Sequence, residues 1–151
     1  MLRRCRARRR AQRGWTLIEA CVAAALAAIL AAIAFPSFDA QILKSRRADA
    51  IAALFRVQMA EERWRANQPR YGSLAEIGAP SRSSAGHYAI AVTATSATSY
   101  ELLASAQGAQ QRDDACRHLK LSMIGSDVMQ ASGPDAAVSN PDALNRRCWS
   151  Q

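Results

Sequence analysis

The sequence predicts an α+β protein in which one long N-terminal helix has a protruding apolar half and a second half packed on a small antiparallel β-sheet. Three observations lead to this prediction. Residues 15–38 form an apolar segment of 24 residues with a single charge. Residues 43–65 repeat apolar side chains at helical spacing, and residues 87–95, 99–106 and 117–123 alternate apolar with polar side chains as half-buried strands do.

The start of the chain is strongly basic. Residues 1–13 hold seven arginines and no acid, so the rest of the chain carries 13 basic and 12 acidic side chains, a formal net charge of +1 in place of +8. Basic residues before an apolar segment hold that end of the chain in the cytoplasm. The high overall charge therefore indicates membrane topology and is not the footprint of a nucleic-acid-binding protein.

The apolar segment 15–38 has the length of a membrane-spanning helix, for which about 20 residues suffice. It contains nine alanines, which favour a helix and allow helices to approach closely. Pro36 predicts a local loosening near residues 32–36 because proline lacks the amide proton that a helix needs. Glu19 is unexpected, since a carboxylate inside a membrane costs at least ~2.5 kcal/mol and requires a compensating cation.

The residues around this boundary resemble the class III signal of type IV pilins and of type II secretion pseudopilins. Gly14 is followed by Trp-Thr-Leu-Ile-Glu, and Pro36 lies at the position of the family's proline. The resemblance implies that a prepilin peptidase cuts after Gly14 and methylates the new N-terminus at Trp15, where the family usually has Phe. It also implies that Glu19 pairs with the Trp15 amine of a neighbouring subunit during filament assembly.

The segment after Pro36 is predicted to continue as an amphipathic helix. Apolar residues fall on one face, and the members of this stripe are Leu43, Ala50, Ile51, Leu54, Phe55 and Val57. Arg47 and Glu61 interrupt the stripe. Asn67 and Pro69 predict the end of the helix, and the stripe is expected to pack on the sheet.

Residues 69–86 are predicted to form a loop because glycine, proline and serine are frequent there. Within it, the stretch YGSLAEIG resembles the loop between helix and sheet in PilE-type pilins, and we assign it no chemistry. A fourth short strand is expected near residues 128–131. The tail, residues 132–147, is predicted to have little regular structure.

The four cysteines fall into two groups. Cys5 lies in the basic leader and Cys21 in the apolar segment, where a thiol acts as a small apolar side chain. Cys116 and Cys148 remain as a pair in a domain that the signal would direct to an oxidising compartment, so we predict a disulfide between them. A metal site is the competing use, but the pair has no C-x-x-C spacing and only His118 nearby.

Catalysis has little support in the sequence, and we expect no catalytic residue, cofactor or metal. The two histidines, His87 and His118, lie in or beside predicted strands, where solvated imidazoles are usual. Asp113 and Asp114 are adjacent acids in a predicted loop and are expected to be solvated. No phosphate-binding loop, metal-ligand cluster or nucleophile motif is present in the sequence.

Basic side chains gather around the predicted disulfide. The candidate DNA-binding residues are Arg117, Lys120, Arg146 and Arg147, with Arg112 and Trp149 nearby. Guanidinium groups beside an aromatic ring suit a nucleic-acid backbone, and some minor pilins take up DNA through such a patch. The alternative is that these residues balance acids on neighbouring subunits.

The resemblance implies a structural subunit of a type IV pilus, of the minor PilE-like kind, in three parts: leader 1–14, apolar helix 15–38 and periplasmic domain 39–151. Its implied partners are other pilins, the prepilin peptidase, an inner-membrane assembly platform, the membrane and DNA. The subunit would be stored in the inner membrane and then assembled into an extracellular filament that supports adhesion, twitching motility or DNA uptake.

Two alternatives stay open. A type II secretion pseudopilin is disfavoured by the C-terminal cysteine pair and by the lack of an acidic calcium loop. A periplasmic binding domain with an ordinary signal peptide would be cut after the triplet Ala32-Ile33-Ala34, which has the small-residue pattern of such sites. That cut would start the mature chain at Phe35 and remove Glu19.

Overall fold

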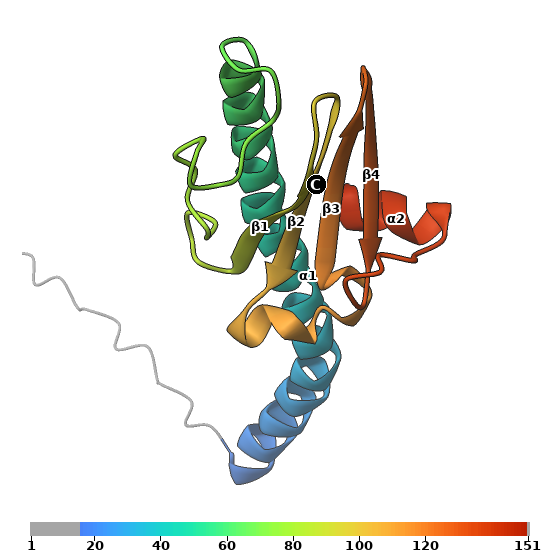
Figure 1. The fold of residues 1–151 in the computed structure, drawn as a ribbon. Coiled ribbons are helices and arrows are strands. Elements are labelled where there is room, and N and C mark those ends of the chain that lie inside the picture. Colours follow the sequence, from blue (N-terminus) through green and yellow to red (C-terminus); the bar gives the residue numbers. More distant parts are fainter. Residues whose placement is uncertain (1–15, 151) are drawn as a thin grey trace, which may run out of the picture. The chain divides into compact units, whose positions relative to one another are not determined.

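Helix α1 covers Leu17–Arg65 of the computed structural model, which describes residues 16–150 (Figure 1). The chain forms two units, residues 1–37 and 38–151, and α1 contributes to both. Gly14 and Trp15, where we predict processing, lie outside the described residues. The helix continues through Pro36, so the loosening expected there does not interrupt it.

The N-terminus of α1 is capped by Thr16. The backbone amide of Glu19 donates to the Thr16 hydroxyl at 3.3 Å, which satisfies one of the free amide groups of the first turn. A carboxylate in the first turn also interacts favourably with the helix dipole. Thr16 and Glu19 have the spacing of a capping box, and the Thr16 cap is a feature that the sequence analysis missed.

Residues 17–30 of α1 present their large apolar side chains to solvent. The large exposed ones are Leu17, Ile18, Val22, Leu26, Ile29 and Leu30. Among residues 16–150, no helix combines the length and the apolar character needed to cross a bilayer.

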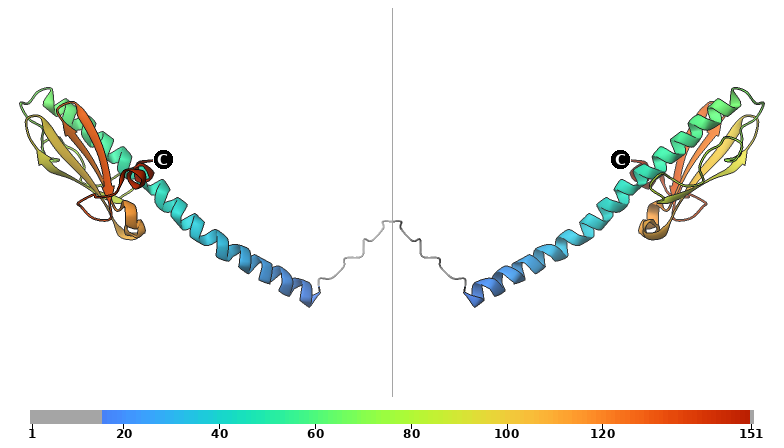
Figure 2. Two further views of the ribbon diagram at one scale, coloured as in Figure 1. Left: turned by 90° about the vertical axis from the view of Figure 1, so that its right-hand side faces the viewer. Right: turned by 90° about the vertical axis from the view of Figure 1, so that its left-hand side faces the viewer.

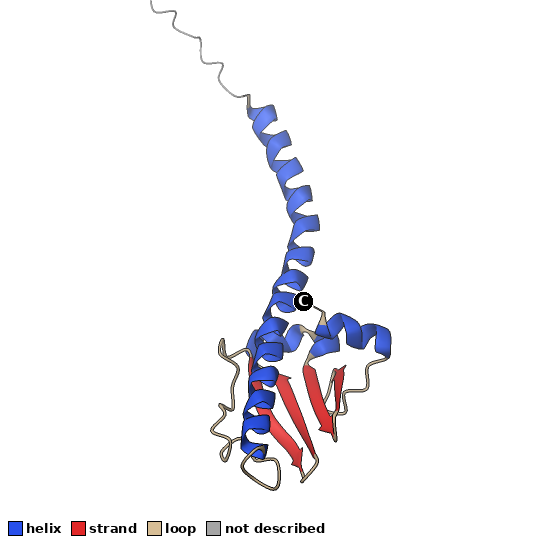
Figure 3. Ribbon diagram, turned by 90° about the horizontal axis from the view of Figure 1, so that it is seen from above, coloured by secondary structure: helices blue, strands red, loops and turns tan. Residues whose placement is uncertain are grey.

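The second unit is a four-stranded antiparallel sheet with neighbouring strands in sequence order (Figure 3). The strands are β1 Tyr88–Thr95, β2 Ser99–Ala106, β3 His118–Ile124 and β4 Asp127–Gly133. Two short 3₁₀ turns, η1 Gly108–Arg112 and η2 Asp114–Cys116, connect β2 to β3, and helix α2 Asp142–Trp149 follows β4. The predicted α+β fold with a helix on a small antiparallel sheet is confirmed.

The core lies between the second half of α1 and one face of the sheet (Figure 2). From α1 it receives Ala50, Ile51, Ala53, Leu54 and Val57, and from the strands it receives Tyr88, Ile90, Tyr100, Leu102, Ala104, Leu119 and Leu121. The alternation in β2 and β3 puts every second side chain on this face, as the sequence predicts. Phe55 is an error of the prediction, because it is 41% exposed and lies outside the buried stripe.

The predicted boundaries need small corrections. Helix α1 ends at Arg65, two residues before Asn67, whose side-chain amide donates to the Arg63 carbonyl at 3.3 Å and caps the last turn. Strand β3 begins at His118, and β4 is longer than the short strand that we expected near residues 128–131.

The prediction of an irregular tail is wrong, because residues 142–149 form α2. The helix starts with Asp142 in its first turn and ends with Arg146 and Arg147 in its last, the charge order that the helix dipole favours. Its Cys148 is fully buried and forms the predicted disulfide with Cys116. The side chain of Asn145 and the indole of Trp149 donate to β4 carbonyls at 2.7 and 3.1 Å, so tertiary contacts hold this short helix in place.

Glu61 interrupts the apolar stripe of α1, and it is completely buried. One carboxylate oxygen accepts the backbone amide of Gly72 at 2.9 Å, which fixes the start of the loop after α1, and the other has no hydrogen-bond partner in the described part of the chain. Gly72 is required at this close approach, since a Cβ atom there would lie 2.8 Å from Ile77 Cγ2. Burial raises the pKa of Glu61, partly opposed by the Gly72 hydrogen bond.

This raised pKa makes stability depend on pH. The folded state binds the Glu61 proton more tightly than the unfolded state does, so stability is highest at low pH and falls as the pH rises above the ordinary value near 4.5. We expect Glu61→Gln, which keeps an acceptor for Gly72, to be more stable than the unmodified protein at pH 7 and to lose this decline. Glu61→Ala leaves the Gly72 amide unpaired and should cost about 1–3 kcal/mol.

Urea unfolding of the three proteins between pH 4 and 8 measures both effects. Asp127→Asn is the matched control, because it makes the same acid-to-amide change at an exposed position. A Glu61→Gln protein that is less stable than the unmodified one at pH 7 would contradict the assignment.

Candidate nucleic-acid interface

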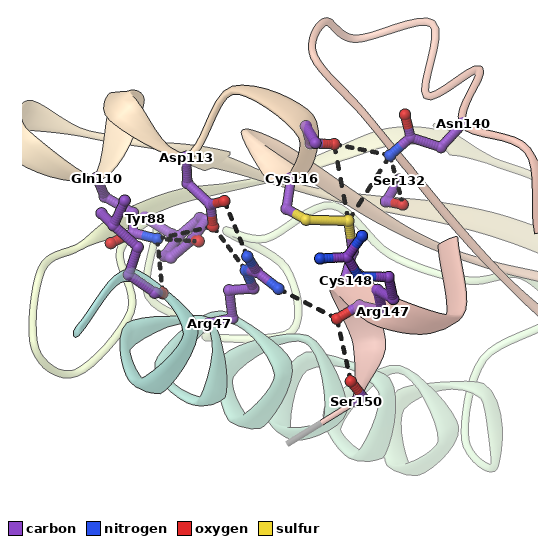
Figure 4. A network of polar contacts seen from close by, with 12 residues as sticks. Arg47, Tyr88, Gln110, Asp113, Cys116, Ser132, Asn140, Arg147, Cys148 and Ser150 are labelled. Atoms are coloured by element: carbon purple, nitrogen blue, oxygen red, sulfur yellow. Dashed lines mark hydrogen bonds and ion pairs between the residues drawn. A yellow bond between two sulfur atoms is a disulfide. The ribbon is translucent and has the colours of Figure 1, made fainter. Parts of the chain in front are cut away.

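The side chain of Arg47 connects α1 to both segments that carry the disulfide (Figure 4). Its Nε and Nη2 donate to the two oxygens of Asp113 at 2.6 and 2.9 Å, and its Nη1 donates to the Arg147 carbonyl at 3.1 Å. Asp113 is buried, which corrects our expectation of a solvated acid. A bidentate guanidinium–carboxylate pair is among the stronger polar interactions in proteins. It therefore fixes the η1–η2 segment on α1.

Gln110 extends this network from η1. Its side-chain amide donates to the Leu43 carbonyl of α1 at 3.1 Å and lies 2.9 Å from the hydroxyl of Tyr88. Tyr88 is buried, and burial raises the pKa of its hydroxyl to about 12. This hydroxyl therefore stays neutral, and the network around Asp113 holds one carboxylate and one guanidinium.

The disulfide brings two arginines from distant parts of the sequence close together. Arg117 follows Cys116 and Arg147 precedes Cys148, and the Cα atoms of the two cysteines are 5.5 Å apart. Because consecutive Cα atoms are about 3.8 Å apart, the Cα atoms of Arg117 and Arg147 lie within about 13 Å of each other. Asn140 supports this arrangement by donating to the Ala115 carbonyl at 2.7 Å and to Ser132 Oγ at 3.0 Å.

The predicted basic residues differ in their exposure and in whether they form ion pairs. Arg146 and Arg147 are exposed on α2, and neither forms an ion pair within residues 16–150. Arg117 is half-buried, pairs with Asp114 and donates to the Gln111 carbonyl at 2.7 Å. The Asp114 carboxylate is itself exposed, so an anionic ligand can compete for Arg117.

Lys120 lies on the other face of the sheet. Its neighbours Leu119 and Leu121 are fully buried against α1, so Lys120 points away from α1. Helix α2 lies on the α1 side, because its Asn145 bonds to Ser132 at 2.8 Å, and Ser132 is paired with Leu119 and fully buried. Lys120 also pairs with Glu101 at 3.4 Å. The structure therefore brings Arg117 and Arg147 together, and Arg146 is exposed next to Arg147 on α2. It separates Lys120 from both arginines of α2.

A second basic surface, missed by the sequence analysis, lines a groove between α1 and the loop that follows it. Arg56, Arg63 and Arg82 line this groove, which has a volume of about 910 Å³. Part of this surface could have been predicted from the sequence, because Arg56 and Arg63 are seven residues apart and therefore share one face of α1. Arg82 lies near them only because the loop after α1 folds back along the helix.

His118 adds no charge to either surface. His118 is half-buried and lies 3.1 Å from the Ser105 hydroxyl through Nδ1. Burial lowers the pKa of His118, so the ring is neutral at pH 7 and adds no charge for an anionic ligand.

Comparison with known proteins identifies the family of this chain. No curated protein matches the sequence. Residues 36–120 match the family described as "Type IV minor pilin ComP, DNA uptake sequence receptor". The match covers more than half of the chain and includes the second half of α1, the loop, β1, β2 and the start of β3. The chain therefore belongs to this family of type IV minor pilins.

Proposed function

We propose that this pilus subunit acts in DNA uptake by binding duplex DNA through Arg117, Arg146 and Arg147, which we call the disulfide-end arginines. The observation that carries the proposal is that one disulfide holds the Cα atoms of Arg117 and Arg147 within about 13 Å of each other. The family description, a receptor for a DNA uptake sequence, supports the choice of DNA.

The physical basis is electrostatic. Each arginine that neutralises a phosphate releases condensed counterions, which favours binding at low salt whatever the base sequence. The planar guanidinium also suits the two oxygens of a phosphate. Lys120 contributes less to this proposal than the sequence analysis expected, because it faces away from α2 and is paired with Glu101.

The earlier steps in the life of the subunit are part of the same proposal. The chain would be held in the inner membrane by its apolar segment, cut by prepilin peptidase after Gly14 and passed by the assembly platform to the filament. Support comes from the motif at residues 14–19 and from the uncovered apolar side chains of α1, such as Leu17 and Leu30, which require a covering partner. Glu19 would pair with the Trp15 amine of the preceding subunit, and we propose a structural and binding role without catalysis.

Changing the three disulfide-end arginines to glutamine should weaken DNA binding and reduce its dependence on salt. The loss of three phosphate contacts should lower the slope of log affinity against log salt by about 2.7. Fluorescence anisotropy of labelled duplex with the full chain in neutral detergent, between 50 and 300 mM salt, measures both quantities.

The matched control changes Arg56, Arg63 and Arg82 to glutamine, which removes the same charge from the groove. This variant and Lys120→Gln should keep a slope close to that of the unmodified protein. If the groove variant loses the slope and the disulfide-end variant keeps it, the site proposed for DNA is wrong.

Removing the disulfide should impair both stability and DNA binding. Cys116→Ser with Cys148→Ser opens a loop of 32 residues in sequence separation, which should cost roughly 3–4 kcal/mol of unfolding free energy. DNA affinity should also fall under conditions where the variant is still folded, because α2 no longer holds Arg147 near Arg117. Cys21→Ser is the control, since Cys21 is an exposed free thiol, and it should change neither quantity.

The assembly role of Glu19 can be separated from its capping position. Glu19→Gln removes the charge but leaves the backbone amide that bonds to Thr16, so the variant should be cut after Gly14 yet enter pili poorly. Thr16→Ala removes the cap and keeps the charge, and it should assemble nearly normally. Immunoblots of sheared pili and membranes give the measurement, and normal pilus levels of Glu19→Gln would refute the pairing role.

A further inference from the structure

The groove beside α1 has an apolar floor and a basic rim. Met59 of α1 and Ile77, Ala79 and Pro80 of the loop give it apolar surface. Arg56, Arg63 and Arg82 supply the charge, and no carboxylate lines the groove. Met59 is 63% exposed, although it lies beside the groove. Such a surface fits a partner with protruding apolar side chains and a negative charge.

The tip of the hairpin between β3 and β4 has the complementary character. Ile124, Val128 and Met129 are 55%, 45% and 52% exposed, an unusual concentration of large apolar side chains at a turn. Asp127 lies among them, is exposed and forms no ion pair within the described part of the chain. Helix α2 covers β4 only farther along, at the carbonyls of Gln130 and Ala131.

The groove and the hairpin tip lie at opposite edges of the sheet. The strand order is β1-β2-β3-β4, so the hairpin belongs to the β4 edge. The loop that forms the groove runs along the β1 edge, where Ser83 donates to the Tyr88 carbonyl at 2.9 Å and Ile90 donates to the Ser81 carbonyl at 2.8 Å. A hairpin tip therefore cannot enter the groove of its own sheet, and any contact between the two surfaces joins two molecules.

We infer that the groove binds the β3–β4 hairpin tip of a second copy of this chain. Ile124 pairs with Asp127, and Met129 lies two residues after Asp127, so these three side chains share the face of the hairpin that points away from α1. Ile124 and Met129 of one copy pack on the apolar floor of the other, and Asp127 meets the arginines of the rim. The contact is heterologous, because the two surfaces differ, and such contacts continue from subunit to subunit instead of closing into a pair. This inference uses membership in a pilus and is independent of DNA binding by the disulfide-end arginines.

Charge and shape favour a protein occupant over duplex DNA for this groove. Phosphate contacts require exposed cations and gain nothing from an apolar floor. A hairpin tip that presents two apolar side chains and one carboxylate on the same face uses both features of the groove. The contact is small, so it is expected to be weak in solution and to act when other subunit contacts raise the local concentration.

Site-directed cross-linking tests the contact. In full chains that carry Cys5→Ser and Cys21→Ser, one preparation receives Met59→Cys and another, with a different tag, receives Met129→Cys. The two are mixed in detergent and treated with a short bismaleimide, which reacts with free thiols and leaves the native disulfide intact. We expect dimers that contain both tags, at several times the yield of a mixture in which Thr93→Cys replaces Met129→Cys.

Charge exchange is the second arm of the experiment. Asp127→Arg in the hairpin copy, or Arg63→Glu in the groove copy, should each lower the yield about fivefold, the factor given by an exposed ion pair at the upper end of its usual strength. The two changes together should restore it. Anisotropy with DNA on the same variants should show the binding of the unmodified protein, which separates this contact from the proposed DNA site.

Three outcomes would overturn the inference. A yield no higher than that of the Thr93→Cys control means that the two surfaces do not meet. Dimers formed equally well within the Met59→Cys preparation alone indicate a symmetric contact between two grooves. Failure of the double charge exchange to restore the yield excludes pairing of Asp127 with the arginine rim.

Discussion

The position of the C-terminal half of this domain depends on one guanidinium group in the middle of α1. Arg47 binds Asp113 through two hydrogen bonds and the Arg147 carbonyl through a third, so it connects α1 with the η1–η2 segment and with α2. Burial of a charged pair carries a desolvation cost that is offset only when the hydrogen bonds of both partners are satisfied. Here both oxygens of Asp113 accept hydrogen bonds from Arg47. Arg47 therefore determines where the η1–η2 segment and α2 pack on α1, and it also holds them there.

Arg47 and Glu61 are the two polar residues that interrupt the apolar stripe of α1. Each of them binds a neighbouring segment and fixes its position on the helix. Arg47 holds the turns between β2 and β3, and Glu61 holds the loop after α1 through the Gly72 amide. The apolar residues between them pack on the sheet without specifying a register along the helix. The polar interruptions provide that register, and the loop and the turns then set the positions of the groove and the disulfide-end arginines.

Periodicity was sufficient to predict α1, the first three strands and the face of α1 that packs on the sheet, because these depend on local alternation of apolar residues. Helix α2 was missed, since it has only eight residues, no side-chain N-cap, and contacts to β4 and Cys116 that lie far away in sequence. The burial of Asp113 was missed for the same reason, as its partner Arg47 is 66 residues away. The position of Lys120 on the outer face could have been predicted, because the alternation around Leu119 and Leu121 already placed it there.

Three surfaces of this chain stay exposed after folding, and they differ from one another in position. The apolar side chains of Leu17–Leu30 are uncovered, the groove lies at the β1 edge, and the hairpin tip lies at the β4 edge. Neither the groove nor the hairpin tip is complementary to itself: the groove carries only positive charge, and the exposed charge at the hairpin tip is the carboxylate of Asp127. A subunit with two different complementary surfaces adds to a chain of subunits, whereas a self-complementary surface would stop at a dimer. The disulfide-end arginines lie elsewhere, on α2 and between η2 and β3. DNA binding and subunit contact can therefore occur on the same molecule without competing for the same residues.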